Sequence, residues 1–243
     1  MTVAALLACT LAAAIKLPRA VRGEGRVSFF GLVFLAVGLL LAIPEVYVVV
    51  DGWLGGHNLT NLIIRVMVQL VGVAVAVSLA RVFSAYRVES FVLSFPGYMA
   101  VAVSIALMGA MLAPMGAWAY SSPGMSAFSG DPWLLSYALV GTLYPSILAA
   151  ALLPPVFRFV FASKGAVVPR IAYLLIVIGM IALVLVSVVQ LLALLGVLDL
   201  GGLAPALASL SPVGFGAGML MLSVWSLGVR LRVAQVKQPT ATA

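Results

Sequence analysis

The sequence predicts an all-α protein: a polytopic transmembrane helical bundle of seven spans, with its N-terminus outside and its C-terminus in the cytoplasm. Composition, the spacing of apolar runs and the placement of basic residues predict it. Of the 243 residues, 65% are hydrophobic and only 8% are charged, whereas a soluble domain is about half apolar and a quarter charged. A chain with so few charges cannot cover such a core with polar surface, so a bilayer is the solvent that fits.

Seven apolar runs are long enough to cross a membrane, for which about 20 residues are needed. The first is short, and we expect Lys16 to extend its aliphatic stem along it toward the interface. The runs lie at 2–17, 27–50, 61–80, 91–113, 133–157, 169–198 and 210–229. We therefore expect one seven-helix transmembrane domain over 1–236, followed by a disordered cytoplasmic tail over 237–243.

Basic residues occur in alternate connections between these runs, and this pattern sets the orientation. The opposite connections hold Asp51, Asp131 and Asp199 and no Lys or Arg. Because cytoplasmic loops carry an excess of Lys and Arg, the basic side is predicted to be cytoplasmic, in a multi-pass protein of the plasma (inner) membrane. The residues on it are Lys16, Arg19, Arg22, Arg26, Arg81, Arg87, Arg158, Lys164, Arg170, Arg230, Arg232 and Lys237.

This topology explains the net charge of +7 without a nucleic-acid partner. The predicted partner is the lipid bilayer itself. The basic cytoplasmic loops are also a predicted docking surface for another protein or for anionic lipid.

Two ionisable residues, Glu45 and Arg65, lie within predicted spans. Such residues are costly in hydrocarbon and often functional. Glu45 comes six residues before Asp51, which on a straight helix places it roughly 9 Å below the outer boundary. Arg65 enters from the same side to a similar depth, so we expect the two side chains to form an ion pair.

Polar residues follow one face of the third predicted span. Asn58, Asn61, Arg65 and Gln69 recur at steps of three or four residues, which place side chains on one side of a helix. We expect this stripe to face the bundle, where it either fastens helices together or lines a pathway for a small-molecule ligand or an ion. The predicted outward-facing pocket contains Glu45, Arg65, Gln69, Asn58, Asn61, Gln190, Tyr137 and Tyr144.

Other patterns favour structure over chemistry. Gly214-x-Gly216-x-Gly218 lies within a span and predicts close helix packing rather than a dinucleotide site. Pro44 and Pro96 are expected to kink or break their helices. The connection 114–132 is rich in Gly, Ser and Pro and is the predicted mobile lid. We find no catalytic triad, nucleotide loop or metal-ligand pair, so no cofactor, metal or catalytic residue is predicted.

The stretch Pro44-Glu45-Val46-Tyr47, with Asp51, Leu54-Gly55 and Asn58-Leu59 before an apolar span, resembles a family of actinobacterial seven-span proteins that are usually labelled transporters. The basic segment Lys16-Leu17-Pro18-Arg19 adds to this resemblance. It covers roughly the first third of the chain, and Gly56 and His57 depart from the Val-Pro expected before Asn58. The resemblance implies the same fold and topology, in a short form that lacks a C-terminal cytoplasmic domain.

Three functions follow as hypotheses. The first is a transporter, or a transporter component, that uses the pocket around Glu45 and Arg65. The second is a sensor or partner-binding membrane subunit that carries no substrate. The third is a membrane-embedded lipid or isoprenoid enzyme in which Glu45 donates a proton. A polar path to both faces would favour transport, a pocket closed below Gln69 would favour sensing, and an apolar chamber around an unpaired Glu45 would favour chemistry.

Overall fold

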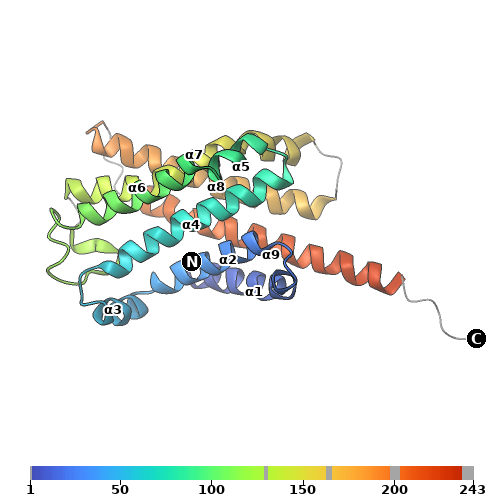
Figure 1. Ribbon diagram of the computed structural model, residues 1–243, viewed down its shortest axis with the longest axis horizontal. Helices are drawn as coiled ribbons and strands as arrows, with labels where there is room; N and C mark the ends of the chain where they lie inside the picture. The colour runs from blue at the N-terminus through green and yellow to red at the C-terminus, as the bar shows by residue number, and fades with distance from the viewer. Residues whose placement is uncertain (1, 129–130, 163–165, 198–202, 237–243) are drawn as a thin grey trace, which may run out of the picture.

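The protein is helical along the residues that the computed structural model describes, which are 2–128, 131–162, 166–197 and 203–236 (Figure 1). No β-strand occurs among them. The helices are α1 Thr2–Val21, α2 Arg26–Leu41, α3 Pro44–Trp53, α4 Leu59–Val82, α5 Tyr86–Val92, α6 Phe95–Met111, the short 3₁₀ helix η1 Pro123–Phe128, α7 Pro132–Ala162, α8 Val167–Leu194 and α9 Leu203–Val236. The predicted disordered tail, 237–243, lies outside the described residues.

Five of these helices are long and apolar enough to cross a membrane: α1, α4, α7, α8 and α9. The bent pairs α2–α3 and α5–α6 raise the number to as many as seven if each pair is one span. The all-α fold and the multi-pass character are therefore as predicted. The seven-span count and the orientation of the termini stay predictions.

The second predicted span, 27–50, is wrong as one continuous helix. It consists of α2 and α3, which meet at a 92° bend. Pro44 is the first residue of α3, and Ile43 before it is extended (φ −73°, ψ 124°). Proline has no N–H and its ring disfavours helix in the residue before it, so the helix must end there and start again in a new direction. The fourth predicted span is divided in the same way, at a 55° bend between α5 and α6.

Six helices form a closed ring. Around the ring, α1 packs against α2, α2 against α4, α4 against α7, α7 against α8, α8 against α9, and α9 returns to α1. Helix α6 packs outside the ring against α7. The ring joins segments that are far apart in the sequence, because α1 and α9 are neighbours.

Glycines let α8 and α9 approach backbone to backbone. A Cβ atom added at Gly214 would lie 2.7 Å from the carbonyl oxygen of Leu175, and one added at Gly218 would lie 2.6 Å from that of Ala172. The predicted close packing through Gly214 and Gly218 is confirmed. Gly216 instead faces α1, where an added Cβ would lie 3.0 Å from Cys9 Sγ.

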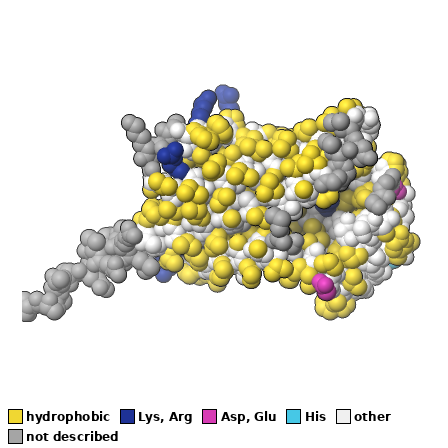
Figure 2. Space-filling view, turned by 180° about the vertical axis from the view of Figure 1, so that it is seen from behind, with side chains coloured by type: hydrophobic (Ala, Val, Ile, Leu, Met, Phe, Trp, Pro, Cys, Tyr) yellow, Lys and Arg dark blue, Asp and Glu magenta, His cyan; other side chains and the backbone are white. Residues whose placement is uncertain are grey.

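The two ends of the bundle differ in charge. We call the end that holds Arg19, Arg26 and Arg81 the basic end, and the end covered by α3 and η1 the capped end. Figure 2 shows hydrophobic side chains over the side of the bundle, with Lys and Arg at one end and acidic side chains toward the other. Ile147 and Leu191 are among the large hydrophobic side chains that the bundle exposes, and an exposed apolar surface suits contact with lipid rather than water.

Candidate functional site

Asn58 is the centre of a buried polar cluster at the capped end. It connects α3 to α4 in the left-handed conformation, with φ 55°, which asparagine tolerates better than most residues. Its Oδ1 accepts hydrogen bonds from Tyr47 Oη at 2.9 Å and from the N–H of Ser122 at 2.7 Å. Its Nδ2 donates to the carbonyl oxygens of Ala117 and Tyr120, both at 2.7 Å. Both polar atoms of the Asn58 side chain are thus hydrogen-bonded within the protein and connect the α3–α4 turn to residues 117–122.

Asp51 completes this cluster from α3. Its carboxylate is fully buried and accepts the backbone N–H groups of Asn58 and Thr60, each at 3.0 Å. Nearby, His57 Nδ1 lies 2.6 Å from the carbonyl oxygen of Trp118. The predicted mobile lid is therefore tied to the α3–α4 turn through residues 117–122; its residues 129–130 lie outside the described part of the chain.

Further along α4, two amides of the predicted stripe bind neighbouring helices. Asn61 accepts a hydrogen bond from Tyr137 Oη at 3.0 Å. Gln69 Nε2 donates to Ser104 Oγ at 2.9 Å and to the carbonyl oxygen of Gly141 at 3.2 Å. The stripe faces the bundle as expected, and these members connect α4 to α6 and α7.

A second polar ladder joins α7 to α8. Thr142 Oγ1 donates to Gln190 Oε1 at 2.9 Å, Ser187 Oγ donates to Thr142 Oγ1 at 2.9 Å, and Ser146 and Ser187 share a hydrogen bond of 2.8 Å. Sequence reasoning missed Thr142 and Ser146. Their four-residue spacing, opposite Ser187 and Gln190 three residues apart, was the available signal.

The predicted Glu45–Arg65 ion pair is not formed. Among the described residues, ion pairs join Arg19 and Arg230 to Glu24, and Arg81 to Glu89. Glu45 is exposed in the first turn of α3. The predicted depth assumed a straight helix, and the 92° bend before Pro44 removes that basis.

Arg65 is partly buried and lies beside α7. Its guanidinium carbon is 5.6 Å from the centre of the Tyr137 ring. Its Cδ passes so close to Gly141 that an added Cβ there would lie 3.0 Å away. Among the described residues, no carboxylate forms an ion pair with it.

A chamber of about 200 Å³ lies inside the ring, with walls from α2, α4, α7, α8 and α9. Arg65, Thr142 and Ser211 are its polar lining residues, and aliphatic side chains, glycines, prolines and two phenylalanines make up the rest. Of the eight predicted pocket residues, only Arg65 lines it. Tyr144 does not, and its buried hydroxyl has no hydrogen-bond partner among the described residues.

The chamber continues toward the basic end through two further cavities. A gap of about 20 Å³ shares Leu35, Val71, Val75, Leu79 and Phe215 with the chamber. A vestibule of about 660 Å³ shares Ser28, Ser78, Leu79 and Met219 with the gap. The chamber, gap and vestibule therefore follow one another through the ring, and Leu79 lines all three.

No group of three or more His, Cys, Asp or Glu that could hold a metal ion occurs in the described part of the chain. The chain matches no protein-family model, no curated protein and no solved structure. The resemblance to actinobacterial seven-span proteins therefore stays a prediction.

Proposed function

We propose that this protein is a membrane transporter, or the membrane component of one, for a small anionic molecule with an apolar body. The observation that carries the proposal is the series of three cavities inside one ring of helices, with Arg65 at the chamber and basic residues around the vestibule. The cavities lead from the chamber to the basic end, which we take to face the cytoplasm. We propose that the substrate enters the chamber from the capped end, which we take to face outward.

The chamber lining favours the substrate class. The planar guanidinium of Arg65 suits a carboxylate or a phosphate, which it can hold through paired hydrogen bonds. The surrounding aliphatic walls suit a hydrocarbon body, as in most small-molecule pockets. A small inorganic ion would leave those walls without a partner, so an amphiphile is the better match.

The gap between chamber and vestibule is the proposed gate. Its volume of about 20 Å³ is too small for such a substrate, so the ring must open there during transport. Pro145 lines the chamber from within α7, and a proline inside a helix removes one backbone hydrogen bond. We propose that α7 bends at this point when the gate opens.

The other two hypotheses fit the cavities less well. An enzyme that uses Glu45 as a proton donor needs this residue at the apolar chamber, and Glu45 does not line it. A sensor would use the same chamber, but its ligand would never cross the gap. Transport measurements separate the sensor from the transporter.

The first test is uptake of a radiolabelled alkyl phosphate by proteoliposomes. We expect uptake above that of empty liposomes, and we expect Arg65→Gln to weaken the apparent affinity by about tenfold to a hundredfold, because a hydrogen bond to a charged group is lost. Arg87→Gln is the matched control, because Arg87 is exposed and lines none of the three cavities. Equal uptake by Arg65→Gln and the control would contradict the proposed role of Arg65.

The second test separates binding from passage. Val71 lines both chamber and gap, so Val71→Phe should block uptake while a photoreactive alkyl phosphate still labels the protein. Val66→Phe, on the same helix but away from all three cavities, should leave uptake unchanged. If the wild-type protein is labelled but takes up nothing, transport is wrong and the sensor hypothesis replaces it.

A further inference from the structure

The vestibule at the basic end has a charge distribution of its own. Four basic residues line it, Lys16, Arg19, Arg26 and Arg81, and no acidic residue does. They come from α1, α2 and α4, whereas α8 and α9 contribute Tyr173 and Trp225. Aromatic rings with one polar atom are typical of the membrane–water interface.

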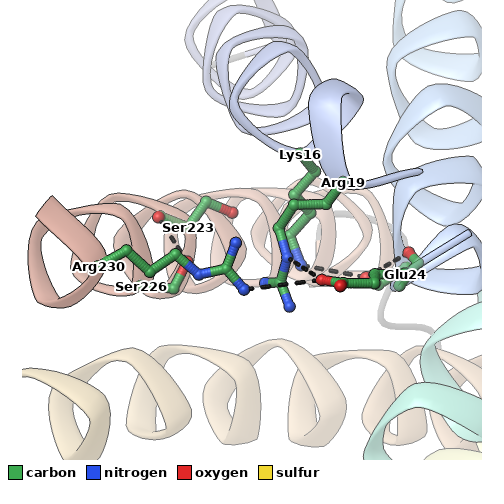
Figure 3. A network of polar contacts seen from close by, with 8 residues as sticks. Lys16, Arg19, Glu24, Ser223, Ser226 and Arg230 are labelled. Atoms are coloured by element: carbon green, nitrogen blue, oxygen red, sulfur yellow. Dashed lines mark hydrogen bonds and ion pairs between the residues drawn. The ribbon is translucent and has the colours of Figure 1, made fainter. Parts of the chain in front are cut away.

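Two of these cations already have carboxylate partners. Arg19 Nε lies 3.3 Å from Glu24 Oε2, and Arg81 Nε lies 2.6 Å from Glu89 Oε1. Figure 3 shows Arg19 and Arg230 converging on Glu24, with Lys16 close by. Since Glu24 is shared with Arg230, whose Nη2 is 3.9 Å away, the local balance stays positive.

Lys16 and Arg26 have no carboxylate partner among the described residues. Lys16 Nζ donates to Ser28 Oγ at 3.1 Å, which uses one of its three donors. Arg26 Nε donates to the carbonyl oxygen of Ala20 at 3.2 Å, which leaves its terminal nitrogens available. Both side chains are thus anchored at the vestibule wall with unused donors.

We propose that the vestibule binds the phosphate of an anionic phospholipid headgroup, held by Lys16 and Arg26, from the leaflet at the basic end. Basic pockets between transmembrane helices recognise such headgroups. The vestibule is recessed between helices and bordered by apolar residues such as Leu222, which suits a headgroup joined to acyl chains better than an acidic protein segment. The site shares the vestibule with the proposed transport route, but it requires neither Arg65 nor the chamber, so lipid can bind there whether or not the protein transports a substrate.

The test compares two double variants that remove the same charge. Lys16→Gln with Arg26→Gln removes the two proposed ligands, whereas Arg22→Gln with Arg87→Gln removes two exposed cations that do not line the vestibule. Purified proteins in detergent are titrated with phosphatidylglycerol and with phosphatidylcholine, and bound lipid is counted by native mass spectrometry. We expect phosphatidylglycerol to bind the first variant roughly thirtyfold more weakly than wild type, at about one kcal/mol per basic residue.

Two further variants keep the result decisive. Arg26→Gln alone changes an exposed residue and should still weaken binding if the double variant fails to fold. Lys16→Arg with Arg26→Lys keeps both charges and should retain most of the binding. An equal loss in both double variants, or no preference for phosphatidylglycerol in the wild type, would overturn the proposal.

Competition with inorganic phosphate shows whether the vestibule binds the phosphate of a lipid headgroup or free phosphate. An excess of inorganic phosphate should leave most phosphatidylglycerol bound, because the acyl chains add apolar contact that the free ion lacks. Complete displacement would show that the vestibule is a site for free phosphate, and the lipid proposal would fail. Arg65→Gln should leave lipid binding unchanged, so this proposal and the proposed transport can fail separately.

Discussion

Among single residues, Asn58 and Arg65 use their polar atoms in opposite ways although both belong to the α4 stripe. Every polar atom of the Asn58 side chain has a partner inside the protein. Arg65 has the Tyr137 ring beside it and no carboxylate among the described residues. A fully bonded amide stabilises the fold, whereas a cation within a span is costly and is the natural candidate for the ligand contact proposed above.

Replacing Asn58 should therefore be costly. Asn58→Ala leaves two carbonyls and the N–H of Ser122 without their partner and places alanine at φ 55°. We expect a loss of about 2–4 kcal/mol in stability, measured by thermal unfolding in detergent. Asn61→Ala is the control, because one hydrogen bond from Tyr137 is lost there. Equal losses would show that the Asn58 cluster adds nothing beyond a single bond.

Replacing Arg65 should have the opposite outcome. Because no described carboxylate is left behind, we expect Arg65→Leu to change the free energy of unfolding by less than about 1 kcal/mol, or to raise it. A buried ion pair with Glu45 would instead cost about 3–5 kcal/mol when broken. The measurement is the thermal unfolding of Arg65→Leu, compared with that of Glu45→Gln. A large loss of stability in Arg65→Leu would contradict the absence of a Glu45–Arg65 ion pair.

Among the helices, the close pairs depend on where glycine stands. Gly214 and Gly218 bring α9 against α8, and Gly179 on α8 meets α9 in return, since an added Cβ there would lie 2.9 Å from the carbonyl oxygen of Ser211. Gly228 lies on the same helix as the first two, and an added Cβ there meets no atom within 4 Å. Glycine is therefore required for helix packing at Gly214 and Gly218, whereas a larger residue fits at Gly228.

This difference gives a matched pair of substitutions. Gly214→Leu should destabilise the protein by about 1–3 kcal/mol or more, because the leucine side chain would push α8 and α9 apart. Gly228→Leu should be neutral or slightly stabilising, since leucine favours helix more than glycine by about 1 kcal/mol. The measurement is again the midpoint of thermal unfolding, and equal effects would contradict the packing described for α8 and α9.

The sequence predicted the helices better than their directions. Apolar runs located every long helix, because hydrophobicity over about 20 residues is enough to identify a span. Pro44 indicated a break, but neither the 92° angle nor the course of α3 follows from local sequence, since packing decides both. The same limit applies to the site. The sequence predicted Arg65 as a pocket residue, but Thr142 and Ser146 gain hydrogen-bond partners only because α7 packs against α8, which the local sequence does not predict.

At the scale of the whole molecule, the ring has two unlike ends, and the predicted topology assigns them to opposite sides of the membrane. Connections at the basic end carry arginines, and α3 and η1 cover the other end (Figure 1). If α2 crosses the membrane, Arg22 and Gly52 must lie on opposite sides. If the bent pair is a re-entrant segment, both lie on one side.

Single cysteines distinguish these topologies. In protein with Cys9 replaced, Gly52→Cys should react with a membrane-impermeant thiol reagent added to intact cells, and Arg22→Cys should react only after the cells are opened. Both positions are exposed, and a Cβ at Gly52 meets no atom within 4 Å, so folding should not be disturbed. Labelling of both positions from the same side would remove α2–α3 as a span.

The closure of the ring by α1 and α9 has a consequence for biosynthesis. The ribosome makes α1 well before α9, so α1 enters the bilayer long before its neighbour in the ring exists. Until then the α1 face that contains Ala5 and Cys9, which are buried in the finished protein, must be held by lipid or by the insertion machinery. The ring therefore closes only when α9 leaves the translocon, and slow release of α9 would expose the half-built chamber to the surrounding membrane.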